Sequence, residues 1–352
     1  MSETTLRAPL PDADAARAAL KRPAAVRLAW LAAALVVVAA ACLASFAFGV
    51  RDVTFEEILR GLSGDTSGVS EAAVAARIPR TALGLLVGAA LGLAGTTFQA
   101  VTRNPLADPG IFGITSGASL AVVGSLAFFG LSGAYPTMGV AIAGAAVTAV
   151  FVYSVGSLGS GGATPLKLAL AGAATTAALQ SLISAVLLPR VDLLEQFRFW
   201  QIGGVGGATW DRISLLTPVL VVGALVVFAM ARGMNSLALG DDLAASLGEH
   251  VGRTRVVATI GAVILCGAAT AIAGPIAFIG LIVPHVCRLT IGTDHRWLLP
   301  ASAIAGAGLL MIADVIGRLV LPSADVEVGI VAALIGAPFF IWIVRRQRVR
   351  EL

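Results

Sequence analysis

Charged side chains are scarce in this sequence of 352 residues, since Asp, Glu, Lys and Arg together make up only 12% of it. Soluble domains carry roughly twice that fraction. Hydrophobic residues make up 58% of the chain, and the mean hydropathy is +0.93. These values exclude an ordinary soluble domain, a disordered chain and a secreted disulfide scaffold. They predict an integral membrane protein.

Cysteine and histidine are also scarce, with three of each, and their positions do not suit a metal site or a disulfide framework. The cysteines all lie in apolar stretches and have no C-x-x-C spacing. His285 and Cys287 are two residues apart, so on a helix they point to different faces. We therefore expect no metal and no cofactor in this chain. Any metal that it handles must arrive wrapped in another molecule.

Lysine occurs only twice, and this excludes the nucleotide-binding loop G-x-x-x-x-G-K-[ST], whose lysine and amides hold phosphates. Lys21 and Lys167 each follow a leucine and not the glycine that the loop requires. We therefore expect a chain that is not an enzyme and does not hydrolyse ATP with this machinery. The net charge of +4 is explained by the orientation of membrane helices and does not indicate a nucleic-acid partner.

Apolar segments of membrane-helix length recur along the chain. A bilayer core needs about 20 apolar residues per helix. The uncharged run 256–286 is too long for one span and too short for two, and Gly274-Pro275 divides it, because proline cannot continue a helix. The predicted fold is an all-α polytopic membrane protein of about ten transmembrane helices, with a short helix after the break. The expected spans are 29–48, 81–101, 110–130, 137–157, 166–188, 213–232, 256–274, 277–290, 298–320 and 329–345.

The basic residues predict how these helices are oriented. Ten spans place both termini on one side, and a cytoplasmic N-terminus puts 16 of the 24 Lys and Arg residues in inner segments. The positive-inside rule favours that choice. We therefore predict a multi-pass protein of the cytoplasmic (inner) membrane with both termini cytoplasmic. Residues 1–28 are expected to form a cytoplasmic tail, and residues 29–352 a single membrane domain.

Polar features inside the spans are few. Gly84, Gly88 and Gly92 repeat every fourth residue, which lets another helix approach closely. Asp314 and Arg318 lie one helical turn apart and could neutralise each other. Carboxylates and histidines that would bind coupling ions at mid-membrane are almost absent. Nothing resembles an ion-selectivity filter. These features favour a wide, weakly polar path for a bulky solute, energised from outside the chain.

An ordered series of motifs runs from about residue 29 to residue 346. It includes Arg77-Ile78-Pro79-Arg80, Thr102 to Gly110 (TRNPLADPG), Leu237-Ala238-Leu239-Gly240, Gly274-Pro275-Ile276-Ala277-Phe278, Asp294-His295-Arg296, Ala313-Asp314 and Gly336-Ala337-Pro338-Phe339-Phe340. The series resembles the FecCD-type family of permeases, which belong to type II ATP-binding-cassette (ABC) importers of iron–siderophores, haem and vitamin B12. The ferric-siderophore members are the most similar.

The resemblance implies a function and a set of partners. The chain would be the permease subunit that translocates a ferric siderophore across the cytoplasmic membrane. Its partners would be a second permease subunit (a copy or a sister chain), two cytoplasmic ATPase subunits that bind ATP and Mg, an external substrate-binding lipoprotein and membrane lipid. Haem or cobalamin stays open as the cargo. An ion-coupled secondary transporter is the alternative from another class, and the ordered motifs disfavour a scaffold that does not transport.

The resemblance also implies roles for particular residues. Arginines at the R-x-P-R position and after the A-D of the ninth span receive carboxylates of the binding protein in relatives, and here these are Arg77, Arg80 and Arg318. A guanidinium suits this role because its planar fork binds carboxylate with two hydrogen bonds. The connection 235–255 would form two short coupling helices that engage the ATPase, with the residues Leu239, Gly240, Asp241, Ala245, Leu247 and Gly248.

Two further regions are expected to serve the solute path. Asn104 and Pro105 would shape a turn and an inner gate. The span 166–188 would line the path, and the small, mildly polar side chains Thr175, Thr176, Ser181 and Ser184 lie in it. Such a lining contacts a large chelate without gripping it, so that the affinity comes from the external binding protein.

Overall fold

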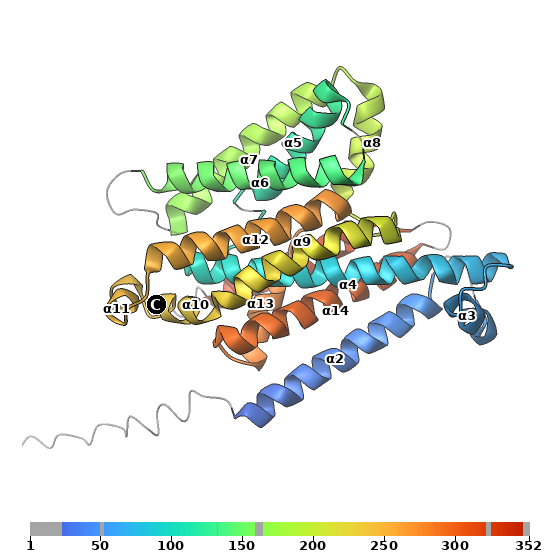
Figure 1. Cartoon of the computed structure of the whole chain (residues 1–352), viewed down its shortest axis with the longest axis horizontal. Helices are drawn as coiled ribbons and strands as arrows, with labels where there is room; N and C mark the ends of the chain where they lie inside the picture. The colour runs from blue at the N-terminus through green and yellow to red at the C-terminus, as the bar shows by residue number, and fades with distance from the viewer. Residues whose placement is uncertain are drawn as a thin grey trace, which may run out of the picture.

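The computed structural model describes residues 23–49, 53–110, 112–131, 133–158, 165–321 and 325–347, and all regular secondary structure within them is helical (Figure 1). Most of the expected tail 1–28 and the last five residues lie outside this range. The helices are α2 (Ala24–Ala47), α3 (Phe55–Leu62), α4 (Val69–Thr102), α5 (Ile114–Phe129), α6 (Ala134–Gly156), α7 (Pro165–Leu187), α8 (Val191–Ile202), α9 (Trp210–Ala229), α10 (Ala231–Leu237), α11 (Asp241–Ser246), α12 (Val251–Ala273), α13 (Ile279–Thr290), α14 (His295–Val320) and α15 (Val328–Gln347).

Apolar helices occupy all ten predicted membrane positions. Among the described residues, seven helices are long and apolar enough to cross a membrane, namely α2, α4, α6, α7, α9, α12 and α14. Helices α5, α13 and α15 are shorter and apolar. The remaining helices, α3, α8, α10 and α11, lie in the connections between these ten. The prediction of an all-α polytopic fold with about ten membrane helices is confirmed.

The predicted break at Gly274-Pro275 separates α12 from α13. Helix α12 ends at Ala273, and Gly274 has a φ of 70°, a backbone conformation that favours glycine. A Cβ atom at this position would also meet the carbonyl oxygen of Trp200. The carbonyl of Ala273, which has no partner in the next helical turn, accepts a hydrogen bond of 2.7 Å from the amide of Gly204. The α8–α9 connection therefore closes the broken end.

Helix α4 begins twelve residues earlier than the predicted span at 81. It runs for 34 residues, about 51 Å at 1.5 Å per residue, and so extends past a bilayer core of about 30 Å. The R-x-P-R motif therefore lies inside the helix, with Pro79 in one of its turns. The charged residues in this stretch are typical of a solvent-exposed loop, but in the structure α2, α3 and α14 pack around α4. The helix therefore begins before the predicted span, and part of its cover comes from the distant segments α2 and α14.

The core of the bundle is built around α4, which packs against α9, α12, α13 and α14. Figure 1 shows α5, α6, α7 and α8 together on one side of these helices and α2 along the opposite side. The glycine repeat of α4 lies against α14, where a Cβ on Gly88 would meet the carbonyl oxygen of Gly306. Close approach of these two backbones maximises van der Waals contact, the main force between helices in lipid. The expectation of close helix packing at this repeat is confirmed.

Candidate functional site

The residues assigned to partner docking and to coupling lie at opposite ends of α4. Arg77 and Arg80 are in its third and fourth turns, whereas Arg103 follows its last residue and lies near Gly240. Figure 1 shows α3 beside the beginning of α4 and the α10–α11 connection near its other end. The chain thus has two polar ends separated by an apolar body.

At the first end, Asp314 lies at the centre of a largely buried group of charges that we call the arginine cluster (Arg77, Arg80, Asp314, Arg318 and the more exposed Asp325). Only 1% of Asp314 is exposed. Its Oδ1 accepts hydrogen bonds from Arg80 Nε at 3.1 Å and Nη2 at 2.9 Å. Its Oδ2 lies 2.9 Å from Arg318 Nη2 in an ion pair that lacks hydrogen-bond geometry. Arg80 Nη1 also donates to Asp325 at 2.5 Å. The predicted pairing of Asp314 with Arg318 is confirmed.

Arg77 and Arg318 bind the end of α2. Arg318 Nη1 donates to the carbonyl oxygens of Ser45 and Phe48 at 2.9 and 3.0 Å, and Arg77 Nη1 donates to Phe46 at 2.7 Å. The last carbonyls of a helix lack partners within it and carry partial negative charge, so two guanidinium groups satisfy them well. Both arginines are buried, with exposed fractions of 7% for Arg77 and 3% for Arg318. The structure thus brings the three predicted docking arginines together, bonded within the chain, and their docking role stays a prediction.

At the second end, the predicted pair of short helices is present as α10 and α11. Gly240 and Gly248 have φ values of 106° and 84° and mark the start and the end of α11. Helix α10 begins at Ala231, before the predicted boundary at 235, and residues 251–255 already belong to α12. Within the described residues the connection therefore has the expected shape, while its role in coupling stays a prediction.

Three exposed leucines in and beside α11, which we call the leucine stripe, recur at intervals of four residues. Leu239, Leu243 and Leu247 follow each other at intervals of four residues and are 55%, 59% and 68% exposed. Apolar groups exposed together mark interaction sites. The predicted coupling residues include Leu239 and Leu247 but omit Leu243, although the spacing of four residues in the sequence could have identified it.

Asp241, the first residue of α11, is held by two arginines. Its Oδ1 lies 2.8 Å from Arg255 Nη2 on α12 and 3.7 Å from Arg103 Nη1 after α4. All three side chains are partly exposed, so water weakens these ion pairs. The contacts join α11 to two membrane helices through charges that can rearrange at little cost.

Asn235 joins α10 to the start of α14. Its Nδ2 donates to Asp294 Oδ1 at 2.7 Å, and its Oδ1 accepts from the backbone N–H of His295 at 2.8 Å. Burial alone would raise the pKa of Asp294, but the hydrogen bonds from Asn235 and from the Arg296 amide, together with the nearby Arg27, outweigh it. The pKa of Asp294 is therefore below its usual value. The sequence marked Asp294-His295-Arg296 as a motif but did not reveal that Asn235 is its partner.

The turn predicted at Asn104 and Pro105 is present. Arg103 has a φ of 51° and ends α4, and Asn104 Oδ1 accepts a hydrogen bond of 2.9 Å from the Leu106 amide. The Ala107 amide donates to the carbonyl oxygen of Asn104 at 3.1 Å. These bonds close the turn within the loop itself, and its function as a gate stays a prediction.

The predicted lining residues of α7 differ in their surroundings. Ser181 and Ser184 are exposed, and their hydroxyls donate to the carbonyl oxygens of Ala177 and Gln180. Thr175 and Thr176 are half-buried, and Thr176 Oγ1 has no hydrogen-bond partner within the part of the chain that the structure describes. Because serine donors are already used inside the helix, this face offers only weak polarity. The path along α7 stays a prediction.

The structure also bears on metal binding. Among the described residues, no group of three or more His, Cys, Asp or Glu side chains is placed to hold a metal ion. The two cysteines in α12 and α13, Cys266 and Cys287, are buried thiols.

Comparison with known proteins gives a consistent result. Residues 35–346 match the family model described as the FecCD transport family. The chain is 44% identical over 305 residues to the ferric enterobactin transport system permease protein FepD of Escherichia coli (strain K12), covering 86% of this chain and 91% of that protein. It is 45% identical over 276 residues to the iron(3+)-hydroxamate import system permease protein FhuB of Bacillus subtilis (strain 168), covering 77% and 71%.

A solved structure has the same fold. The inward-facing conformation of a metal-chelate type ABC transporter matches with a TM-score of 0.77 and 25% sequence identity. The match covers 91% of this chain and 99% of that one.

Proposed function

The chain belongs to the FecCD transport family, and from this premise we propose that it is the membrane permease subunit of an ABC importer for a ferric siderophore. The observation that carries the proposal is the 44% identity to a ferric enterobactin permease protein across 86% of this chain. The similarity to an iron(3+)-hydroxamate permease protein supports the same class of cargo. In both cases the cargo is a bulky chelate, which suits a path without strong ligands.

We propose that a separate ATPase subunit engages the α10–α11 connection. The leucine stripe Leu239, Leu243 and Leu247 supports this, because three exposed leucines beside a membrane domain need a protein partner to cover them. The ion pairs of Asp241 would carry a displacement of α11 to α4 and α12. ATP and Mg would be bound by that partner, and α11 of this chain would transmit its movement to the membrane helices.

We propose that the external binding protein docks at the arginine cluster, chiefly through Arg80. Arg77 and Arg318 donate to fixed carbonyl groups of α2 and are almost fully buried. The partner of Arg80 on its outer side, Asp325, has a side chain that is 32% exposed. A carboxylate of the binding protein could therefore replace Asp325 on Arg80. Replacing the acceptors of the other two arginines would instead leave the last carbonyl groups of α2 without hydrogen-bond donors.

We propose that the cargo passes along α7, between this chain and a second permease subunit. Helix α7 is long enough to span the membrane, yet only 22% of its most apolar stretch is buried within the chain. Its exposed residues are Leu170 and Leu182 together with the small residues Ala173, Ala174, Ala177, Ala178, Ser181, Ser184 and Ala185. A helix of this kind fits an internal boundary of a dimer better than the body of a monomer.

The test is uptake by a reconstituted transporter. The permease, its ATPase and its binding protein are placed in lipid vesicles, and accumulation of iron-labelled catecholate and hydroxamate siderophores is compared with that of haem and cobalamin. We expect uptake of a siderophore that requires ATP, the ATPase and the binding protein together. Preference for haem or cobalamin would contradict the proposed siderophore cargo. Uptake without the ATPase that collapses with an uncoupler would establish a secondary transporter.

A further inference from the structure

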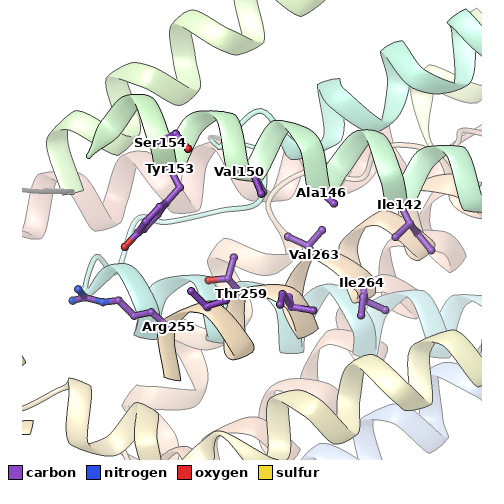
Figure 2. A pocket seen from close by; sticks show the side chains of 12 residues that line it. Ile142, Ala146, Val150, Tyr153, Ser154, Arg255, Thr259, Val263 and Ile264 are labelled. Carbon is purple, nitrogen blue, oxygen red and sulfur yellow. The ribbon is translucent and has the colours of Figure 1, made fainter. Parts of the chain in front are cut away.

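An apolar groove of about 230 Å³ lies between α6 and α12. Figure 2 shows Ile142, Ala146 and Val150 of α6 facing Val263 and Ile264 of α12 across it. The groove is open to the surroundings, since Val150 of α6 and Val256 and Ile260 of α12 are among the exposed large hydrophobic residues. In a helix pair that spans the membrane, such an opening faces either lipid or another protein chain.

The polar side chains of the lining lie toward one end of this groove, with Thr259 one helical turn further along α12 than Arg255. Tyr153 and Ser154 of α6 and Arg255 of α12 line that end, and Figure 2 shows the Tyr153 hydroxyl and the Arg255 guanidinium on the same side. Arg255 Nη2 bonds to Asp241, but its buried Nε has no hydrogen-bond partner among the described residues. A buried N–H without an acceptor is costly, so an acceptor that reached this guanidinium would be favoured.

We propose that the groove binds one anionic phospholipid, with an acyl chain between α6 and α12 and the phosphate at Arg255 and Tyr153. The two parts of the site match the two parts of such a lipid, because an apolar channel is joined to a cation and a hydroxyl. Arginine near the end of a membrane helix commonly keeps its head at the interface, where headgroups lie. An apolar partner helix would cover the apolar part of the groove but would not match its charged end.

The position of Arg255 gives this site a consequence for coupling. The same guanidinium holds Asp241 at the start of α11, so a phosphate at Nε would fix Arg255 while its Nη2 keeps the carboxylate. Lipid binding would therefore stiffen the link between α11 and α12. If α11 faces the ATPase, as in the proposed function, the lipid belongs to the cytoplasmic leaflet. Binding itself does not rest on that function.

The test uses photoreactive phospholipids and no ATPase, so its failure is distinct from a failure of the proposed function. The full chain is placed in nanodiscs that contain a diazirine-bearing phosphatidylglycerol or the matching phosphatidylcholine, and labelled peptides are identified by mass spectrometry. We expect label on the facing stretches of α6 and α12, with about fivefold more from phosphatidylglycerol, the factor that one basic residue supplies near an anionic headgroup.

Matched variants locate the headgroup. R255Q should remove the preference for phosphatidylglycerol, whereas R253Q, the same charge change at an exposed arginine outside the groove, should keep it. I260W should fill the groove and lower labelling by both lipids. Equal labelling by the two lipids in the unaltered chain would overturn the proposal even if R255Q fails to fold. An equal loss in R253Q, or cross-links from the groove to a second protein chain, would overturn it as well.

Discussion

The two ends of α4 use arginine in opposite ways. At the arginine cluster the guanidinium groups are buried and bonded to a buried carboxylate or to fixed backbone carbonyls. At the α10–α11 connection Arg103 and Arg255 share one partly exposed carboxylate, that of Asp241. Breaking a buried charge pair is expensive, whereas an exposed pair contributes little and rearranges easily. The first end therefore holds α2, α4 and α14 in one arrangement. At the second end, α11 can shift relative to α4 and α12 at little energetic cost.

The largest effect is expected from removing the centre of the arginine cluster. Asp314→Ala leaves the buried Arg318 without a carboxylate and Arg80 with only Asp325, and the expected loss of stability is about 3–5 kcal/mol. The control is Asp325→Ala, which removes a partly exposed partner of Arg80 and should cost about 1 kcal/mol or less. The midpoint of denaturant unfolding in detergent micelles measures both. Similar losses in the two variants would show that the cluster is no more rigid than an exposed ion pair.

The second prediction concerns the middle of α4, which connects the two ends. Gly88→Ala places a methyl group against the backbone of Gly306 and should destabilise the chain by about 1–3 kcal/mol, as overpacking does. The matched control is Gly139→Ala in α6, where a Cβ meets nothing within 4 Å and should stabilise the helix by about 0.5–1 kcal/mol. Unfolding midpoints of the two variants should move in opposite directions. A shift of the same sign in both would contradict the close contact of α4 with α14.

The sequence predicted the fold well because its signals there are local. Runs of apolar residues gave the positions of the ten membrane helices, and Gly274-Pro275 gave the break between α12 and α13. The two short helices of the connection were implied by the family resemblance, and Gly240 and Gly248 mark the start and the end of the second one. Each of these features depends on residues that are neighbours in the chain, so pattern and turn chemistry are enough.

The sequence predicted the arginine cluster less well because its partners are far away in the chain. Arg318 bonds to the end of α2 more than 270 residues earlier, and Arg80 bonds to Asp314 across 234 residues. An arginine that will be buried by such contacts looks the same in a sequence as one that faces solvent. The early start of α4 and the burial of Arg77 were therefore missed, and only the Asp314–Arg318 pair, four residues apart, could be recognised.

The third prediction concerns the α10–α11 connection and is tested by ATP-driven uptake. Leu243→Asp puts a charge into the leucine stripe and should lower ATP-driven uptake about tenfold, the equivalent of about 1.4 kcal/mol at an interface. Stability should change by no more than about 0.5 kcal/mol, since Leu243 is exposed. Uptake in reconstituted vesicles and the unfolding midpoint are measured together. A control at the same helix, Ser246→Asp, introduces the same charge at an exposed residue outside the stripe and should preserve more uptake. Loss of stability with loss of uptake would contradict a purely external role.

The smallest effect is expected at Asp294, where the connection meets α14. The pKa of this carboxyl in the folded chain is below its ordinary value of 3.8, so the ionised form is favoured by folding. Its contribution to stability is therefore complete above the ordinary pKa and is lost as the pH falls through the lower, folded-state pKa. The side chain is 34% exposed, and salt will screen its attraction to Arg27.

Asp294→Asn keeps the shape of the side chain and removes this contribution, so the variant should be slightly less stable than the unaltered chain at pH 7. The difference should stay constant down to about pH 4 and shrink below it, because the unaltered carboxyl then takes up a proton in the folded state. Unfolding midpoints between pH 7 and pH 3, at low and high salt, measure the difference. A gap that widens in acid would mean that Asp294 is favoured in its protonated form. The junction would then be buried and rigid like the arginine cluster, and the contrast between the two ends of α4 would not hold.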